Sequence, residues 1–327
     1  MATYLITGVA GFIGSTLARA VLAQGGEVVG FDNLSTGKRE NLAGLESIKL
    51  HEADLMDVEA LRRACRGVDY VFHEAAIPSV PRSVEDPLGN NQANVVGTLN
   101  LLVAARDAKV KRVVYAASSS AYGDSPTMPK REDMLPSPIS PYATAKLAGE
   151  HYMSNFYQCY GLETVSLRYF NVFGPRQDPG SQYSGVLARF ISQMLAGQEP
   201  TIFGDGTQSR DFTYVDNVVE GNLLACTAPG GEVAGRVFNV ATGQRIDLNQ
   251  TVQILKKLTG YSGVVKYSAE READVKHSLA DISLAEKHLG YQPKVDFEEG
   301  LARTIAWYRT RVPAAQLSRS ARVRDSG

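Results

Sequence analysis

Two side chains near the middle of the chain have the types and spacing needed for proton transfer. Tyr142 and Lys146 lie four residues apart and follow Pro141, a residue type that favours the first turn of a helix. On a helix this spacing places the phenol and the ammonium on one face. A free tyrosine, whose pKa is about 10, is a poor base at neutral pH, but an adjacent positive charge stabilises its phenolate. The pair predicts a tyrosine general base, with a plain surface Tyr/Lys pair as the alternative.

Hydroxyl groups lie upstream of this pair. Ser118, Ser119 and Ser120 follow the β-branched run 113–117, which has the composition of a buried strand. The carboxyl edge of a parallel sheet is where ligands of such sheets bind, so one serine there can hydrogen-bond to a reacting oxygen. A serine triplet alone is more typical of a structural turn. Its occurrence with Tyr142 and Lys146 favours the chemical interpretation.

A glycine-rich segment near the N-terminus has the pattern of a phosphate-binding turn. Gly8, Gly11 and Gly14 lie in TGVAGFIG, between a strand-like run and a helical pattern, where backbone N–H groups and a helix N-terminus can meet a pyrophosphate. Asp32 ends the next strand-like run, where a carboxylate can accept hydrogen bonds from an adenosine ribose. Together they predict a dinucleotide site. The alternative for Asp32 is a turn or helix-capping residue.

The charge of Asp32 also bears on the choice of dinucleotide. A carboxylate repels a 2′-phosphate, so the sequence favours NAD over NADP. Lys38 and Arg39 are close in sequence and could weaken that preference. Asp54 and Leu55 follow the third strand-like run and could meet the adenine, although Asp54 also suits a solvated turn.

The elements that must position these residues alternate between two periodicities. Short β-branched runs separated by helical patterns predict an α/β fold class, a doubly wound parallel sheet of the Rossmann type. The predicted strands are 4–7, 28–32, 48–52, 70–74, 113–117 and 163–168, and the helical patterns between them include 13–23, 58–65 and 95–107. No repeat of 20–50 residues is visible, which excludes solenoid and propeller folds.

A smaller C-terminal domain is expected to interleave with this sheet. Beyond about residue 170 a Gly/Pro/Gln-rich segment, 174–185, precedes new helical and strand-like runs. The run 236–240 again resembles a sheet strand, whereas 248–259 and 283–289 resemble helices. We therefore predict a Rossmann domain of residues 1–170 with returning segments about 212–240 and 279–283, a smaller α/β substrate domain of about 171–211 and 241–308, and a flexible tail, 309–327.

Composition narrows the class of protein. The 327 residues include 34 Lys+Arg and 35 Asp+Glu, a net charge of -1, so no single-sign field is present to recruit nucleic acid or a membrane surface. Three widely spaced cysteines supply neither a disulfide framework nor a metal-binding CxxC motif, so no metal is expected. No basic leader and no apolar run of ~18 residues is present, which predicts a cytoplasmic location.

Taken together, the motifs resemble those of the extended short-chain dehydrogenase/reductase family. The resemblance covers residues of about 2–308 and includes TGVAGFIG, Asp32 at a strand end, HEAA from His73, SSSAYG and YATAK. Within that family the chain is most similar to nucleotide-sugar C4-epimerases, especially those of UDP-N-acetylhexosamines. This similarity lies in LRYFNVFGPRQDP from Leu167, QSRDFTYVDN from Gln208 and READVKHSLADIS from Arg271. It implies bound NAD, a UDP-sugar substrate, a homodimer and C4 epimerisation through transient oxidation to a 4-keto sugar.

The resemblance also implies roles for individual positions. Tyr142 matches the general base, Lys146 the residue that lowers its pKa and holds the nicotinamide ribose, and Ser118, or else Ser119, the hydroxyl partner. Asn171 matches a contact to the substrate diphosphate, which Arg210 and Arg271 clamp with bidentate guanidinium groups. The expected cofactor-binding residues are Gly8, Gly11, Phe12, Ile13, Gly14, Asp32, Asn33, Asp54, Leu55, Ala75, Tyr142 and Lys146. The expected substrate-binding residues are Ser79, Ser118, Ser119, Tyr142, Asn171, Gln177, Arg210, Arg271 and Ser278.

Two other kinds of activity fit parts of this pattern. Sugar-nucleotide 4,6-dehydratases and UDP-glucuronate decarboxylases also oxidise C4. The dehydratases of the family carry Thr-Asp-Glu where this chain has Ser118, Ser119 and Ser120, so the acid needed for elimination is missing there. A non-catalytic NAD-binding sensor is the third possibility, and the presence of both Tyr142 and Lys146 argues against it.

One position bears on which sugar fits. In the epimerases that the chain resembles, the position of Ser278 lies beside the 2-substituent of the sugar. There a tyrosine closes the pocket to N-acetyl groups and a small residue leaves room. Ser278 therefore predicts activity on UDP-N-acetylglucosamine as well as UDP-glucose, with an ordinary loop serine as the alternative.

Overall fold

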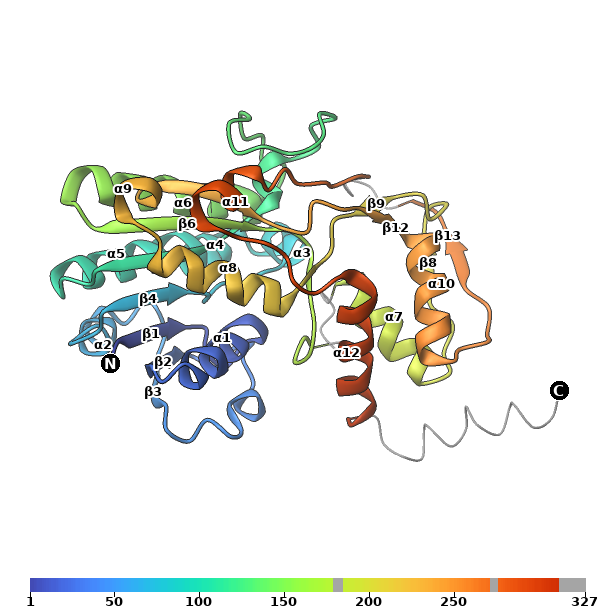
Figure 1. Cartoon of the computed structure of the whole chain (residues 1–327), viewed down its shortest axis with the longest axis horizontal. Helices are drawn as coiled ribbons and strands as arrows, with labels where there is room; N and C mark the ends of the chain where they lie inside the picture. The colour runs from blue at the N-terminus through green and yellow to red at the C-terminus, as the bar shows by residue number, and fades with distance from the viewer. Residues whose placement is uncertain (179–184, 271–275, 312–327) are drawn as a thin grey trace.

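A seven-stranded parallel sheet forms the centre of the larger lobe. The computed structural model describes residues 1–178, 185–270 and 276–311 (Figure 1). The strand order is β11-β6-β5-β4-β1-β2-β3. In chain order the strands are β1 (Thr3–Thr7), β2 (Glu27–Asp32), β3 (Lys49–Glu52), β4 (Tyr70–His73), β5 (Arg112–Ser118), β6 (Glu163–Tyr169) and β11 (Arg236–Val240). The doubly wound parallel sheet predicted from the sequence is confirmed, and its order reverses between β1 and β4, where such sheets bind ligands.

Helices cover both faces of the sheet because alternate strand residues point to opposite sides. Leu5 and Ile6 are both fully buried, and they belong to different cores. The core with Ile6 includes residues of α1 (Phe12–Ala23), α8 (Val215–Thr227) and α11 (Ser283–Leu289). The core with Leu5 includes residues of α2 (Val58–Ala64), α5 (Gly97–Asp107) and α6 (Pro141–Tyr160). Burial on both faces accounts for the continuous apolar runs of these strands.

The long helix α6 begins and ends at positions that its sequence specifies. The Ser140 hydroxyl accepts a hydrogen bond from Ala143 N at 3.1 Å, and Pro141 occupies the first turn. At the other end Gly161 adopts the left-handed conformation with φ of 70°. The start of α6 carries Tyr142, so these capping residues fix where the phenol enters the site.

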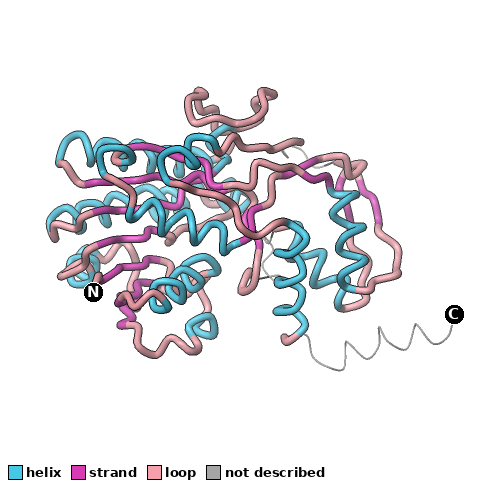
Figure 2. Tube along the Cα trace, in the orientation of Figure 1, coloured by secondary structure: helices cyan, strands magenta, loops and turns pink. Residues whose placement is uncertain are grey.

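A second lobe packs its own core beside the sheet (Figures 1 and 2). It contains α7 (Val186–Leu195), α10 (Leu248–Thr259) and α12 (Phe297–Arg309), whose apolar faces meet around Phe190, Ile202 and Leu255. Its short strand pairs are β7 (Val172–Phe173) with β10 (Thr213–Tyr214), β8 (Thr201–Phe203) with β13 (Lys266–Ser268), and β9 (Ser209–Arg210) with β12 (Ile246–Asp247). The remaining short helical segments are η1 (Arg39–Leu42), α3 (Val80–Glu85), α4 (Pro87–Asn91), η2 (Gln92–Val96), η3 (Ser119–Tyr122) and α9 (Gly230–Val233).

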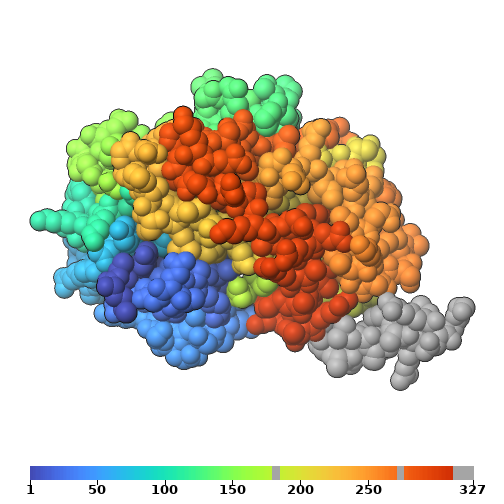
Figure 3. All heavy atoms as spheres, viewed as in Figure 1, coloured from blue at the N-terminus to red at the C-terminus, as the bar shows by residue number. Residues whose placement is uncertain are grey.

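One predicted assignment differs from the structure. The sequence placed residues 283–289 in the substrate domain, but α11 packs on the sheet lobe beside β11, with Ala285 and Leu289 buried in the same core as Phe238. The buried Tyr291 anchors this segment by donating to Ala241 O at 2.9 Å. Figure 3 shows α11 and α12, in red, lying over both lobes.

The helix expected over 95–107 also starts differently. The α-helix α5 begins at Gly97, and the five residues before it, Gln92–Val96, form a π-helical turn. This turn carries Asn94, whose amide donates to Ile77 O at 3.2 Å and accepts from Ile77 N at 2.8 Å. The contact holds the segment after β4 against the helix.

Within the described ranges, no helix is long and apolar enough to cross a membrane. The three cysteines are free thiols. Cys65 and Cys226 are buried, and Cys159 is exposed on α6.

Candidate active site

A cavity of about 1430 Å³ lies at the carboxyl ends of the sheet strands and extends toward the second lobe. The structure brings nearly all of the sequence-predicted site residues to its wall, and Arg271 lies outside the described residues. Those lining it are Gly8, Gly11, Phe12, Ile13, Gly14, Asp32, Asn33, Asp54, Leu55, Ala75, Ser79, Ser118, Ser119, Tyr142, Lys146, Asn171, Gln177, Arg210 and Ser278. Residues more than 200 positions apart in the sequence therefore line the same cavity.

The glycine turn is built so tightly that side chains would not fit. Gly8 has φ of +69°, and a Cβ there would come within 2.7 Å of the backbone nitrogen of Ala75. A Cβ on Gly14 would come within 2.2 Å of Gly8 O. Helix α1 starts at this turn with Gly11 as its N-cap and no side-chain cap, so its first N–H groups are available to a ligand. This geometry fits a pyrophosphate at the helix N-terminus.

Asp32 is held at the end of β2 by two backbone donors. Its Oδ2 accepts from Ala10 N at 2.9 Å and its Oδ1 from Leu34 N at 2.8 Å. These bonds fix the carboxylate beside the glycine turn. The neighbouring cations are turned to other partners, since Lys38 pairs with Asp178 at 2.9 Å and Arg39 pairs with Glu52. Lys38 and Arg39 therefore do not pair with Asp32, and the Asp32 carboxylate can still repel a 2′-phosphate.

Asp54 lines the cavity and is also a turn residue. Its Oδ1 accepts from Met56 N at 2.9 Å and its Oδ2 from Asn33 Nδ2 at 2.6 Å. The sequence suggested two roles for Asp54, a contact to the adenine and a turn residue. This geometry is compatible with both.

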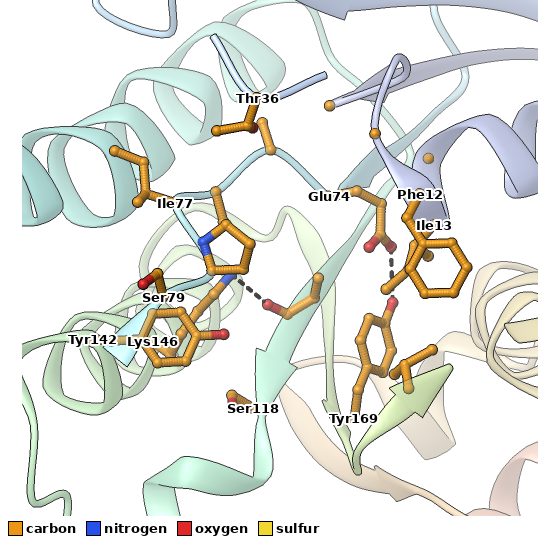
Figure 4. Close-up of a pocket in the computed structure, with 18 of the residues that line it drawn as sticks. Phe12, Ile13, Thr36, Glu74, Ile77, Ser79, Ser118, Tyr142, Lys146 and Tyr169 are labelled. Atoms are coloured by element: carbon orange, nitrogen blue, oxygen red, sulfur yellow. Dashed lines mark hydrogen bonds between the residues drawn. The ribbon is translucent and has the colours of Figure 1, made fainter. Parts of the chain in front are cut away.

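Tyr142 and Lys146 enter the cavity from the first turns of α6, and Ser118 comes from the end of β5 (Figure 4). The buried Ser83 hydroxyl accepts from Tyr142 N at 3.0 Å and so fixes the helix start. Ser118 is the serine that acts electrostatically on the Tyr142 phenol, and its Oγ accepts from Ser120 Oγ at 2.8 Å. Of the two serines considered, Ser118 therefore lies in the better position to meet a reacting oxygen.

The electrostatics of this group differ from the sequence expectation. Burial raises the pKa of the Tyr142 phenol above its ordinary value, and the nearby Ser118 hydroxyl opposes the shift. Lys146 Nζ donates to Ala116 O at 2.8 Å, and burial lowers the pKa of this lysine to about 8. In the protein alone, Lys146 does not offset the effect of burial on the phenol.

Three polar residues are linked by hydrogen bonds where the cavity extends toward the second lobe. Asn171, with φ of +38°, donates from Nδ2 to Asp211 O at 2.8 Å and to Ser278 Oγ at 3.0 Å. The Asp211 carboxylate is buried and accepts from the backbone nitrogens of Thr242 and Gly243, each at 3.0 Å. Asn171 is thus engaged with the protein through its amide donors, and it connects the turn after β6 to the segment that carries Ser278.

The other predicted substrate residues have internal partners as well as a place in the wall. Arg210 Nη1 on β9 donates to Lys276 O at 2.8 Å. Gln177 Nε2 donates to Val172 O at 3.1 Å. Ser79 caps α3 by accepting from Arg82 N at 3.1 Å. These bonds orient the side chains along the cavity.

Sequence reasoning missed several residues of the cavity wall. Glu74, Arg82, Lys130, Tyr169 and His277 all line it. Glu74 carried a readable signal, because a carboxylate in the otherwise apolar run YVFHEAA is costly to bury unless it has a partner or a function. Its partner Tyr169 lies 95 positions away, with its hydroxyl 2.8 Å from the carboxylate, and no local pattern could have indicated that contact.

Comparisons with known proteins agree with this geometry. Residues 4–241 match the NAD dependent epimerase/dehydratase family. The chain belongs to this family. Over 312 residues it is 40% identical to a UDP-glucose 4-epimerase of Mycolicibacterium smegmatis, covering 94% of this chain and 98% of the relative.

Solved structures of family members show the same arrangement. A UDP-N-acetylglucosamine 4-epimerase from Methanobrevibacter ruminantium, in complex with UDP-N-acetylmuramic acid, superposes with a TM-score of 0.91 at 41% identity, covering 95% of this chain and 99% of that one. A UDP-glucuronic acid 4-epimerase from Bacillus cereus, in complex with UDP-glucuronic acid and NAD, gives 0.87 at 33% identity, covering 94% and 99%.

The family uses NAD, and the glycine turn, the bare start of α1 and the oriented Asp32 fit that cofactor. Across residues 1–178, 185–270 and 276–311, no group of three or more His, Cys, Asp or Glu residues is arranged to hold a metal ion.

Asp32→Asn tests the predicted cofactor preference. The amide keeps an oxygen for Ala10 N or Leu34 N but removes the charge that repels a 2′-phosphate. We expect NAD affinity to fall by about 10–100-fold, the range for a lost charge-assisted hydrogen bond, and the NAD/NADP affinity ratio to fall with it. Both affinities can be measured by calorimetry. Asp54→Asn is the matched control and should leave the ratio unchanged, whereas wild-type selectivity in Asp32→Asn would show that Asp32 does not discriminate.

Proposed function

We propose that the protein interconverts the C4 epimers of a UDP-hexose, with NAD as a cofactor that stays bound through each turnover. The observation that carries this proposal is the meeting of Ser118, Tyr142 and Lys146 at the carboxyl edge of the NAD-binding sheet, inside a cavity that continues to Arg210 and Ser278 of the second lobe. A cavity of about 1430 Å³ has room for both a dinucleotide and a nucleotide sugar. The similarity to UDP-sugar 4-epimerases supports the reaction class.

In the proposed mechanism the protein moves one proton and holds two ligands. When bound, NAD would supply the hydride acceptor for C4 of the sugar and the hydride donor for its opposite face, so that no net oxidation would occur. The Tyr142 oxygen takes the proton from the 4-hydroxyl group and gives it back in the second half of the reaction. Ser118 donates a hydrogen bond to the same sugar oxygen, and Lys146 supplies positive charge that stabilises the phenolate.

Epimerisation also requires a firm hold on the part of the substrate that does not react. The sugar must turn over between the two half-reactions while the diphosphate stays bound. Arg210, on the far side of the cavity from Tyr142 in the second lobe, is proposed to bind the diphosphate together with Asn171 and Arg271. Guanidinium groups suit this task because their planar donors bind phosphate in bidentate fashion.

The substrates that we propose are UDP-N-acetylglucosamine/UDP-N-acetylgalactosamine and UDP-glucose/UDP-galactose. Support comes from the small side chain of Ser278 in the cavity wall and from similar proteins that act on each kind of sugar. UDP-glucuronate is a second candidate, since a UDP-glucuronate 4-epimerase of Thermodesulfobacterium geofontis is 36% identical over 325 residues.

A homodimer, which the family resemblance implies, is proposed as the assembly, with α5 and α6 at its interface. Tyr157 and Tyr160 of α6 are 37% and 55% exposed, which leaves apolar surface on that helix for a second copy. Light scattering of the purified protein tests this assembly, and a monomer mass would contradict it.

Product analysis by NMR tests the proposed reaction. Purified protein is incubated separately with UDP-glucose, UDP-N-acetylglucosamine and UDP-glucuronate, without added NAD. We expect the axial C4 epimer from the first two substrates. A 4-keto-6-deoxy product would indicate a dehydratase, a pentose product would indicate a decarboxylase, and unchanged substrates in all three samples would favour a non-catalytic NAD-binding protein.

A further inference from the structure

Glu74 places an ionisable carboxyl group in the active-site cavity that the proposed mechanism does not use. It directly follows β4 and lines the cavity together with Phe12, Lys146 and Tyr169. Tyr169 Oη donates to Glu74 Oε1 at 2.8 Å (Figure 4). Asn222 Nδ2 of α8 donates to Tyr169 Oη at 2.7 Å. A partly buried carboxyl group in a cleft, with a strongly perturbed pKa, is a candidate for function.

The place of Glu74 in the fold relates it to the cofactor. Its backbone N–H donates to Thr7 O at 3.2 Å, immediately before the glycine turn that fits the pyrophosphate. Its carboxyl group interacts electrostatically with Lys146, which lies at the reacting end of the cavity. A dinucleotide that extends from the glycine turn to Tyr142 would therefore pass beside Glu74 as it approaches Lys146.

We propose that Glu74 sets the balance between the oxidised and reduced forms of the bound NAD. The nicotinamide ring is positively charged in NAD⁺ and neutral in NADH, so a carboxylate beside it favours NAD⁺. The attraction between these two opposite charges in a partly buried site corresponds to a preference for NAD⁺ over NADH of about tenfold or more. NAD⁺ is the form needed at the start of each turnover, and the inference rests on the proposed function only in requiring that NAD is bound.

The charge state of Glu74 makes the preference depend on pH. Burial raises the pKa of Glu74 to about 7, and the Tyr169 hydrogen bond and the Lys146 charge act in the opposite direction. Of the groups that face it, Tyr169 has a pKa well above its ordinary value and His73 a pKa lowered to about 3, both mainly through burial, so both stay neutral. Asn222 and the apolar start of α1 carry no charge.

The direction follows from these values. Above its pKa Glu74 is ionised and favours NAD⁺, and the preference falls as the pH drops through about 7. Lys146, whose pKa is about 8, loses its positive charge as the pH rises and so changes the preference in the same direction at higher pH. The bound NAD⁺/NADH ratio should therefore change with pH in two steps, one near pH 7 from Glu74 and one near pH 8 from Lys146. Removal of the Glu74 charge should abolish the lower step.

The experiment measures which form of NAD the holoenzyme holds, with no sugar present. Protein is equilibrated with an excess of an equimolar NAD⁺/NADH mixture at a series of pH values, separated from free nucleotide and denatured, and the released nucleotides are quantified. Glu74→Gln keeps an oxygen for Tyr169 and removes the charge. We expect its bound NAD⁺/NADH ratio at pH 8 to be about tenfold lower than that of the wild type, or about 30 mV for this two-electron couple.

Two further variants separate charge from structure. Tyr169→Phe keeps the carboxylate but removes a donor that stabilises it, so the lower pH step should move upward. Glu132→Gln removes the charge of a half-buried carboxyl group that is not part of the cavity wall and that accepts from Asn239 N at 2.7 Å. This control variant should leave the ratio unchanged.

Several results would overturn the inference. A wild-type ratio that is constant between about pH 6 and 8 would do so without any variant, even if Glu74→Gln failed to fold. A Glu74→Gln ratio equal to that of the wild type, or a Tyr169→Phe profile superimposed on it, would also contradict the role. Because no sugar is used, these outcomes do not depend on whether the protein is an epimerase.

Discussion

Tyr142→Phe should lower epimerase turnover by about 10²–10⁴-fold, the range typical of a lost general acid–base group. The phenol oxygen is the atom proposed to exchange a proton with the 4-hydroxyl group, and the variant removes that atom alone. The ring remains to fill the same space, and Tyr142 N still donates to Ser83 Oγ through the backbone. Folding and NAD content should therefore be nearly unchanged.

A second tyrosine on the same helix provides the control for the chemical effect of Tyr142→Phe. Tyr157→Phe lies on α6 as well, at a position 37% exposed and away from the cavity, and should keep full turnover. Steady-state rates, circular dichroism and nucleotide content are measured for both variants. Turnover near the wild-type value in Tyr142→Phe would remove Tyr142 from the mechanism.

Ser278→Tyr should abolish activity on UDP-N-acetylglucosamine and spare activity on UDP-glucose. Ser278 lies in the cavity wall, with its Oγ 3.0 Å from Asn171 Nδ2. A tyrosine there fills space that only the N-acetyl group needs, and overpacking typically costs about 1–3 kcal/mol, with larger clashes excluding the ligand. The expected result is a specificity ratio that changes by at least about 10–100-fold toward UDP-glucose.

Ser278→Ala separates the effect of volume from the loss of a hydrogen bond. It removes the contact with Asn171 but adds no atoms, so any loss should be similar for the two substrates. The measurement is kcat/KM for both sugars in wild type, Ser278→Ala and Ser278→Tyr. Equal effects of Ser278→Tyr on the two sugars would contradict a gate at this position, as would a wild-type enzyme inert toward N-acetyl sugars.

Much of the fold was predictable because it depends on local patterns. The run 113–117 is apolar and occurs in β5, and the run 163–168, with β-branched Thr164 and Val165, occurs in β6; both strands are largely buried on both faces. The packing of α11 on the sheet was not predictable, because Ala285, Leu289 and Tyr291 would suit either lobe by composition. Such a choice depends on which apolar surface β11 leaves uncovered, and that surface exists only after the chain has folded.

The candidate site also has one part that the sequence predicts and one part that it does not. The glycine turn, Asp32 and the Tyr142/Lys146 pair have short-range spacing that carries a chemical meaning, and the structure places all of them around one cavity. The partner of Lys146, Ala116 O, and the contact of Glu74 with Tyr169 join separate strands and helices. Side-chain contacts of this kind depend on strand order and register, which sequence periodicity does not specify.

The most direct test of the proposed mechanism follows the hydrogen on C4. UDP-N-acetylglucosamine carrying deuterium at C4 is incubated in ordinary water with purified protein and no added NAD, and the epimer is examined by NMR and mass spectrometry. If the hydride leaves C4 and returns to it within one active site, the product retains deuterium at C4 and gains none of the solvent's hydrogen there. Loss of the deuterium to solvent would contradict transient oxidation by bound NAD, and it would require a different chemistry at C4.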